Sequence, residues 1–311
     1  MRSKHWGKAG YGMFLNDLIN SQLGPILGAW LARRLSPEGS YRLADWLAAR
    51  FAARPETALC KAIRANQAVV RGLPYDSPEL DNVVGEVLRN AARGYADWFR
   101  AIAEGPDYVR AKVRVDEHIL EDAWRASERG HGVVFAGAHM SSFNMFLAVL
   151  GYESLPIQVL SYHRARGSYK SDNYLRHRLG IDVSPISMES LREAVRRLKQ
   201  RGFVLTGVDR PDVGGELLNF FGRQVRLPVG HARLAIRTGA HMIVGVVRRE
   251  GPDGYHVTGP RIIEPVRSGD QKRDILQLAQ HVADILAGYI RQSPEEWMMF
   301  LPVWPDVIPS S

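Results

Sequence analysis

The chain has 311 residues, a formal net charge of +8 and a single cysteine, Cys60. Its 45% apolar and 24% charged residues are typical of a folded chain with a sizeable core and exclude an intrinsically disordered protein. One cysteine excludes an internal disulfide and argues against a structural zinc site. The basic excess, mostly arginine, is compatible with anionic lipid, phosphorylated substrates or nucleic acid as partners.

The N-terminal segment is basic, but no apolar run follows it, so it lacks the pattern of a signal peptide. Residues 18–32 carry no charge, yet they include polar residues, glycine and proline and fall short of the roughly 20 apolar residues that span a bilayer. Over 14–35 the apolar side chains fall on one helical face, which ends at Arg33 and Arg34. This pattern fits a helix lying in a membrane interface, and equally a helix packed on the protein's own core.

The apolar spacing changes near residue 130. Before that point, apolar residues three and four apart predict helices at 41–53, 56–71 and 77–104. Beyond it, short apolar runs alternate with amphipathic segments. We predict buried strands at 133–136, 157–162, 203–208 and 242–247, helices at 142–150, 168–179, 187–201, 229–238 and 270–291, and an edge strand or hairpin at 255–265.

This alternation predicts βαβ units and therefore an α/β fold, with a mostly parallel central sheet flanked by helices and a helical N-terminal region. We place the helical region at 1–115 and the α/β domain at 116–311.

The sequence VVFAGAHMSSFN at 133–144 brings a buried strand directly to a histidine and then to a helix start. Ligands of open α/β sheets bind beyond the carboxyl ends of the strands, which places His139 at the mouth of a site. Ser141 or Ser142 can cap the following helix, and Asn144 in its first turn can reach back to the imidazole. That is the geometry of a general base with an orienting partner, although a purely structural histidine fits the same pattern.

A second strand end carries Asp209 and Arg210. Because the carboxyl ends of parallel strands meet at one edge of a sheet, His139, Asp209 and Arg210 are predicted to share a polar site there. A simple turn before Pro211 is the alternative for Asp209.

Several motifs are missing from the sequence. There is no phosphate-binding glycine loop, dinucleotide-binding glycine pattern or G-x-S-x-G nucleophile elbow, and the histidines lack paired metal-ligand spacing. No helix-turn-helix or RNA-binding signature is present either. We therefore expect neither cofactor nor metal, and no nucleic-acid partner.

Four blocks in order resemble the bacterial late acyltransferases of lipid A and the related phosphatidylinositol mannoside acyltransferases. The family pattern is a His, four residues, and then an Asp or Glu. Here the same spacing runs from His139 to Asn144. A strand ending in Asp209 is followed by an aromatic-glycine segment and a small-residue helix, within 206–240. The chain closes with a Pro-Glu-x-Trp…Trp element, formed by Pro294, Glu295, Trp297 and Trp304, and Asn66 lies in the helical first third. The resemblance runs from about residue 20 to the end.

This resemblance implies a glycerolphosphate acyltransferase-like fold and an O-acyltransferase that needs no cofactor. The enzyme would move an acyl chain from acyl-CoA or acyl carrier protein to a hydroxyl of a glycolipid or lipid A-like acceptor, with His139 as general base. The amino-acid sequence of the His139 motif is closer to that of the acyltransferases that act on glycolipids than to that of the lipid A enzymes. Candidates for substrate binding are Arg164, Arg166, Arg210, Glu216 and Phe221. For Phe221, lining of the acyl path and a hairpin with core aromatics are both open.

Asn144 departs from the family pattern, because an amide cannot supply the negative charge that a carboxylate would. A comparable Asp-to-Asn change in serine proteases lowers turnover by about 10⁴. Three interpretations follow: a slow enzyme, one in which another carboxylate such as Asp209, Asp212 or Glu216 acts, or a degenerate homologue that binds lipid or acyl carrier without turnover.

If the family resemblance holds, the protein should act on the cytoplasmic face of the cell membrane, as a peripheral or monotopic protein on an anionic lipid surface.

Overall fold

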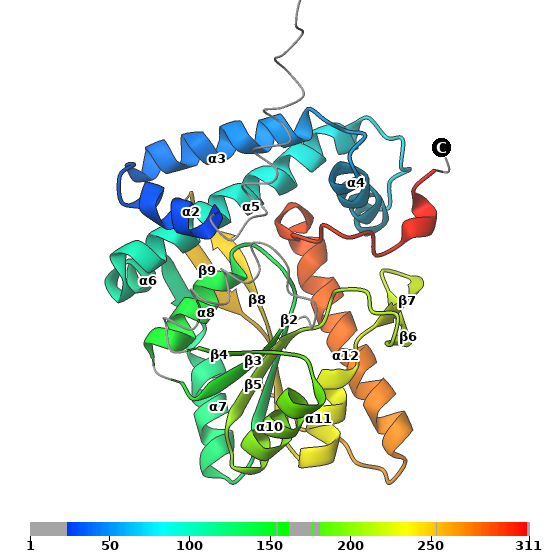
Figure 1. The fold of residues 1–311 in the computed structure, drawn as a ribbon. Coiled ribbons are helices and arrows are strands. Elements are labelled where there is room, and N and C mark those ends of the chain that lie inside the picture. Colours follow the sequence, from blue (N-terminus) through cyan, green and yellow to red (C-terminus); the bar gives the residue numbers. More distant parts are fainter. Residues whose placement is uncertain (1–23, 154, 162–175, 177–180, 253, 310–311) are drawn as a thin grey trace, which may run out of the picture.

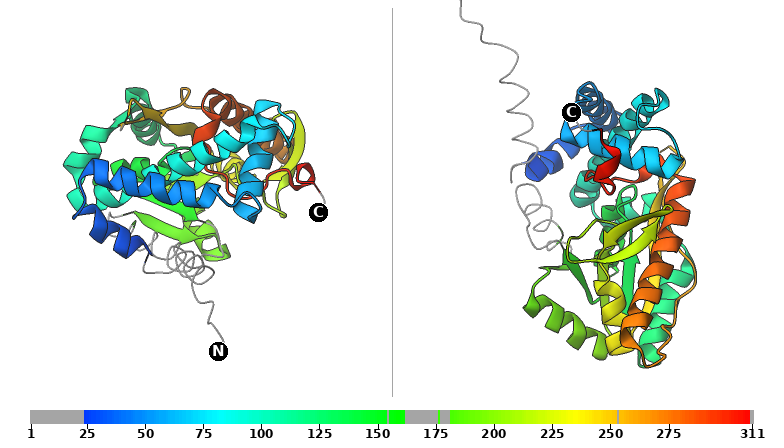
Figure 2. Two further views of the ribbon diagram at one scale, coloured as in Figure 1. Left: turned by 90° about the horizontal axis from the view of Figure 1, so that it is seen from above. Right: turned by 90° about the vertical axis from the view of Figure 1, so that its right-hand side faces the viewer.

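The computed structural model describes residues 24–309 apart from 154, 162–175, 177–180 and 253. A layer of helices lies across one end of an α/β body (Figure 1). The layer consists of α2 (Gly24–Ala32), α3 (Pro37–Ala52), α4 (Ala58–Arg71), α5 (Glu79–Glu104) and α6 (Pro106–Lys112). Seen from above, α3 and α5 cross over the body (Figure 2).

The body is built on a seven-stranded sheet with the order β1-β9-β8-β2-β5-β3-β4. All neighbouring strands are parallel except β8 and β9. The strands are β1 (Val113–Val115), β2 (Val133–Gly137), β3 (Ile157–Ser161), β4 (Asp182–Pro185), β5 (Phe203–Gly207), β8 (His241–Glu250) and β9 (Gly254–Thr258). The predicted α/β class with a mostly parallel sheet is thus confirmed.

Helices cover both faces of this sheet, and a hairpin lies beside it. The helices are α7 (Glu117–Glu128), α8 (Phe143–Tyr152), α10 (Met188–Lys199), α11 (Gly230–Thr238) and α12 (Gln271–Gln292), and the hairpin strands are β6 (Glu216–Phe220) and β7 (Arg223–Leu227). Side chains alternate along β2, so Val134 and Ala136 join a core with α11 and α12, while Val133 and Phe135 join a core with α7 and α8.

Three sequence expectations need correction or fall outside the described residues. The segment predicted as an edge strand or hairpin at 255–265 contains β9, which forms a hairpin with β8. It is not an edge strand, because the short β1 pairs with its outer side. The strands β1 and β4 were not predicted, since each has only three or four residues and little burial. The helix expected at 168–179, apart from Arg176, and the part of 14–35 before residue 24 lie outside the described residues.

The helical layer is tied to the C-terminal segment, which runs between α4 and the body (Figure 1). Asn66 of α4 is buried, and its amide donates to the carbonyls of Met299 at 3.0 Å and Leu301 at 2.8 Å. Its Oδ1 accepts the peptide N–H of Val303 at 2.9 Å. Cys60 is buried in the same region, as its apolar neighbours predicted. Among the described helices, none has the length and apolar character needed to cross a membrane.

Candidate functional site

Two neighbouring strands deliver the candidate site. β2 and β5 are parallel and in register up to their last residues, Gly137 and Gly207. Two residues beyond the end of each strand, the chain reaches His139 after β2 and Asp209 after β5. The two side chains therefore meet at one sheet edge although 70 positions separate them in sequence.

The imidazole of His139 is hydrogen-bonded to the Asp209 carboxylate. Nδ1 lies 2.6 Å from Oδ1, and the peptide N–H of His139 donates to Oδ2 at 2.8 Å. The Asp209 side chain is fully buried, whereas one third of the His139 side chain is exposed. Because Asp209 engages Nδ1, the neutral ring carries its free lone pair on Nε2, the nitrogen left for a substrate proton.

The protonation of this pair follows from burial and charge. Burial pushes the pKa of His139 down, but the charge and hydrogen bond of Asp209 outweigh it and raise that pKa above its usual value of 6.5. Burial alone would raise the pKa of Asp209. The charge and hydrogen bond of His139, together with the indole N–H of Trp297, hold the pKa of that carboxyl below its usual value. An ionised carboxylate beside an imidazole is the arrangement of a general base with its orienting group.

The sequence predicts that Asn144 reaches back to the imidazole of His139, but the structure does not show this contact. Asn144 is buried in the first turn of α8, and its Oδ1 accepts from Nη2 of Arg176 at 2.7 Å. The prediction failed because Nδ1 of His139 is already taken by Asp209. Neither serine caps α8 within the described residues: Ser141 donates to the Glu296 carboxylate and Ser142 to the carbonyl of Gly94, at 3.0 Å.

The imidazole also depends on a glycine that sequence reasoning missed. A Cβ added at Gly207 would lie 2.8 Å from Cε1 of His139, closer than van der Waals contact allows. On another side, the Phe143 ring packs edge-on at 5.2 Å between ring centroids. The signal in the sequence is a glycine at the strand end before Asp209, but its meaning depends on which strand lies alongside.

The C-terminal segment completes the site from the other side. The indole N–H of Trp297 donates to Oδ2 of Asp209 at 2.8 Å. The peptide N–H of Met298 donates to the carbonyl of His139, and that of Ser141 to the carbonyl of Glu296, both at 2.7 Å. The family resemblance singled out Trp297 as a motif residue, but its contact with Asp209 was not predicted.

Other predicted residues lie in different settings. Phe221 is half-buried at the tip of the β6–β7 hairpin, in an aromatic cluster with Phe220, Trp297 and Trp304, which is the arrangement of a hairpin with core aromatics. Glu216 begins β6 and forms a surface ion pair with Arg233 at 3.1 Å. The Asp212 carboxylate instead accepts the peptide N–H of Gly214 at 3.1 Å, within a turn.

The predicted arginines also divide. Arg210 is half-exposed directly after Asp209, and its positive charge partly opposes the rise that Asp209 causes in the pKa of His139. Arg176, which the sequence did not single out, acts on His139 in the same way. Arg164 and Arg166 lie outside the described residues. In the part of the chain that the structure describes, no cluster of three or more His, Cys, Asp or Glu residues could hold a metal ion.

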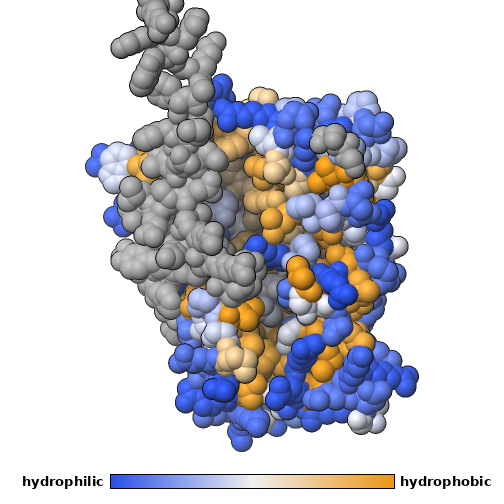
Figure 3. All heavy atoms as spheres, turned by 45° about the vertical axis from the view of Figure 1, so that its right-hand side comes forward, coloured by the Kyte–Doolittle hydropathy of each residue, from blue (hydrophilic) through white to orange (hydrophobic). Residues whose placement is uncertain are grey.

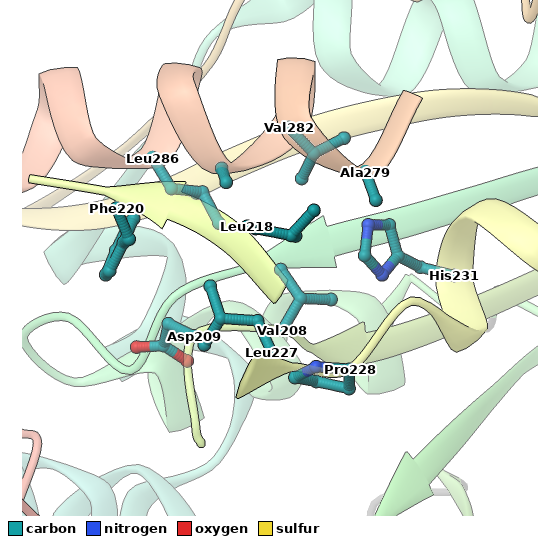
Figure 4. Close-up of a pocket in the computed structure, with 11 residues that line it drawn as sticks. Val208, Asp209, Leu218, Phe220, Leu227, Pro228, His231, Ala279, Val282 and Leu286 are labelled. Carbon is teal, nitrogen blue, oxygen red and sulfur yellow. The ribbon is translucent and has the colours of Figure 1, made fainter. Parts of the chain in front are cut away.

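A small apolar cavity lies behind Asp209, between the hairpin, α11 and α12. It has a volume of about 10 Å³, room for about one water molecule, and its lining includes Val208, Leu218 and His231. Figure 4 shows His231 and Asp209 at opposite ends of this lining. Neither ring nitrogen of His231 has a hydrogen-bond partner among the described residues, and burial lowers its pKa to about 4.

Comparison with known proteins supports the resemblance seen in the sequence. A family model described as bacterial lipid A biosynthesis acyltransferase matches residues 25–305. A phosphatidylinositol mannoside acyltransferase of Mycolicibacterium smegmatis is 29% identical over 295 residues, which cover 91% of each chain. A protein of the same name from Mycobacterium tuberculosis is 27% identical over 295 residues, or 88% of this chain and 86% of the other.

Proposed function

Since the chain belongs to the bacterial lipid A biosynthesis acyltransferase family and is an acyltransferase, we propose that it moves a fatty acyl chain from a thioester donor, acyl-CoA or acyl carrier protein, to a glycolipid hydroxyl. The observation that carries this proposal is the His139–Asp209 pair at the carboxyl edge of the sheet. The names of the two mycobacterial relatives favour a mannosylated or otherwise glycosylated glycerolipid as acceptor over a lipid A precursor.

The chemistry needs one base and no covalent enzyme intermediate. Nε2 of neutral His139 takes the proton of the acceptor hydroxyl as its oxygen attacks the thioester carbonyl carbon. Asp209, held ionised, stabilises the imidazolium that forms. When the tetrahedral intermediate collapses, the C–S bond breaks and the leaving thiolate takes the proton back from Nε2, so ester, thiol and neutral imidazole result.

Positive charge near the base suits the anionic parts of this reaction. Arg176 and Arg210 both act electrostatically on His139, so they lie within range of an oxyanion formed at the carbonyl or of a substrate phosphate. Figure 3 shows apolar side chains gathered along a hollow in one face of the molecule, a surface of the kind that an acyl chain would occupy.

We also propose that α2 and α3 rest on an anionic membrane surface at the cytoplasmic face. Four large apolar side chains of these helices are exposed: Leu27 and Trp30 of α2, and Leu43 and Trp46 of α3. The Arg34 guanidinium lies 4.8 Å from the Trp30 ring centroid, and that of Arg50 lies 5.9 Å from the Trp46 ring centroid. Tryptophan beside arginine is typical of a headgroup-level contact, in which each basic residue adds about 1 kcal/mol on anionic lipid.

The catalytic proposal is tested by acyl transfer from labelled palmitoyl-CoA or palmitoyl-acyl carrier protein to bacterial lipid extract. We expect wild type to transfer label, His139→Ala to lose transfer, and Asp209→Asn to lose most of it. Asn144→Asp should stay near wild type, because residue 144 does not hold the imidazole. Lipid binding without transfer by wild type, with transfer regained in Asn144→Asp, would instead support the degenerate homologue.

The membrane proposal is tested by sedimentation with vesicles of phosphatidylglycerol and phosphatidylcholine. We expect Trp30→Ala/Trp46→Ala to bind these vesicles several-fold more weakly than wild type. Trp124→Ala is the matched control, since Trp124 is also exposed but lies on α7. Equal loss in both variants, or equal binding to vesicles without anionic lipid, would contradict the proposal.

A further inference from the structure

The C-terminal segment 296–298 contacts both halves of the His139–Asp209 pair. Backbone hydrogen bonds join it to the loop on either side of Met140, from Ser141 to Glu296 and from Met298 to His139, each at 2.7 Å. Between these two bonds, Trp297 is 1% exposed and extends its indole N–H to Asp209. The segment therefore fixes the loop through backbone bonds and the carboxylate through one side chain.

The two oxygens of Asp209 are used differently. Oδ2 accepts two N–H groups, from the Trp297 indole and the His139 peptide, both at 2.8 Å. Oδ1 is thereby left to Nδ1 of His139 at 2.6 Å. A carboxylate can rotate about its Cβ–Cγ bond, and donors on one oxygen restrict that rotation.

We propose that Trp297 is a positioning residue of the acyl transfer: its indole N–H holds the Asp209 carboxylate so that Oδ1 stays directed at His139. This inference rests on the proposed function of the pair as general base and orienting group. Trp297 acts through Asp209 and touches no reacting atom. Its loss should lower turnover rather than substrate binding, because the orientation of the imidazolium partner matters most in the transition state.

The chain offers a closely matched control in Trp304. Both tryptophans are buried in the aromatic cluster, with ring centroids 6.3 Å apart, and both pack against Phe220 and Phe221. The indole nitrogen of Trp304, however, has no hydrogen-bond partner among the described residues. Trp→Phe at the two positions therefore removes similar packing, and only at 297 does it remove a donor to Asp209.

The experiment measures kcat and KM for Trp297→Phe and Trp304→Phe, each in the wild-type and the Asp209→Asn backgrounds. We expect Trp297→Phe to lower kcat about tenfold with KM within twofold, and Trp304→Phe to leave both within twofold. In the Asp209→Asn background the Trp297→Phe loss should shrink to less than threefold, because the carboxylate through which it acts is gone. Equal losses in the two Trp→Phe variants, or a full tenfold loss in the Asp209→Asn background, would overturn the proposal.

A second substitution and a second readout keep the test independent of packing and of turnover. Replacing Trp297 by 3-benzothienylalanine keeps the bicyclic shape but puts sulfur in place of N–H, and it should reproduce the loss in kcat. Proton NMR of the resting protein follows the downfield signal of Nδ1–H in His139. We expect that signal to move upfield or broaden in the Trp297 variants and to stay in Trp304→Phe. An unchanged signal in the Trp297 variants refutes the positioning role. Absence of acyl transfer by wild type refutes only the proposed function.

Discussion

His231 makes the stability of this protein depend on pH in a way that one substitution can isolate. The imidazole is buried beside the apolar cavity, neither nitrogen has a partner among the described residues, and burial lowers the pKa from 6.5 to about 4. In the unfolded chain the same group binds a proton near pH 6.5. Between about pH 6.5 and 4 the unfolded state therefore binds more protons, so stability falls as pH falls.

The size of this effect follows from the two pKa values. At about 1.4 kcal/mol per pH unit, the gap between 6.5 and about 4 amounts to about 3 kcal/mol of stability, lost in full only below pH 4. At pH 5.0 the same two values give a loss of about 2 kcal/mol, and at pH 7.5 almost none. His231→Leu keeps a side chain of similar volume among apolar neighbours and removes the titrating group.

The assay is urea unfolding of wild type and His231→Leu at pH 7.5 and pH 5.0. Wild type should lose about 2 kcal/mol more than the variant between these two pH values. His281→Gln is the control, because it removes an exposed histidine of α12 and leaves the cavity intact. If His231→Leu loses as much stability as wild type on acidification, His231 is not held neutral by burial and the reasoning fails.

Three further predictions concern the base, its packing and the scaffold. Because Asp209 raises the pKa of His139, the pH-rate profile of wild type should show kcat/KM falling as pH drops through a value above 6.5. In Asp209→Asn this fall in kcat/KM should begin at lower pH, and kcat should be about 10⁴-fold lower. Gly207→Ala should displace the imidazole and lower kcat by about 10²-fold with an unchanged circular dichroism spectrum. Gly288→Ala should raise stability by about 0.5–1 kcal/mol in thermal unfolding, since an added Cβ in α12 would contact nothing within 4 Å.

The sequence alone determined which residues reach the edge of the sheet. Short, largely apolar runs at 133–136 and 203–208 are enough to predict β2 and β5, and hence that His139 and Asp209 follow strand ends. Helical periodicity likewise predicts α3, α4, α5 and α12 to within a few residues of their observed bounds. These features are local, since strand and helix periods are written into neighbouring positions.

Which residue holds His139 was decided only by the tertiary structure. Asn144 is the nearer candidate in sequence, but the turn into α8 directs its amide to Arg176. Asp209 reaches Nδ1 because β2 and β5 are neighbours, and strand order depends on how all the helices pack on both faces of the sheet. Trp297 meets Asp209 across 88 positions for a similar reason: Asn66 and the helical layer hold the C-terminal segment against the His139 loop. Such contacts join residues that share no local pattern, so periodicity and motif spacing carry no signal for them.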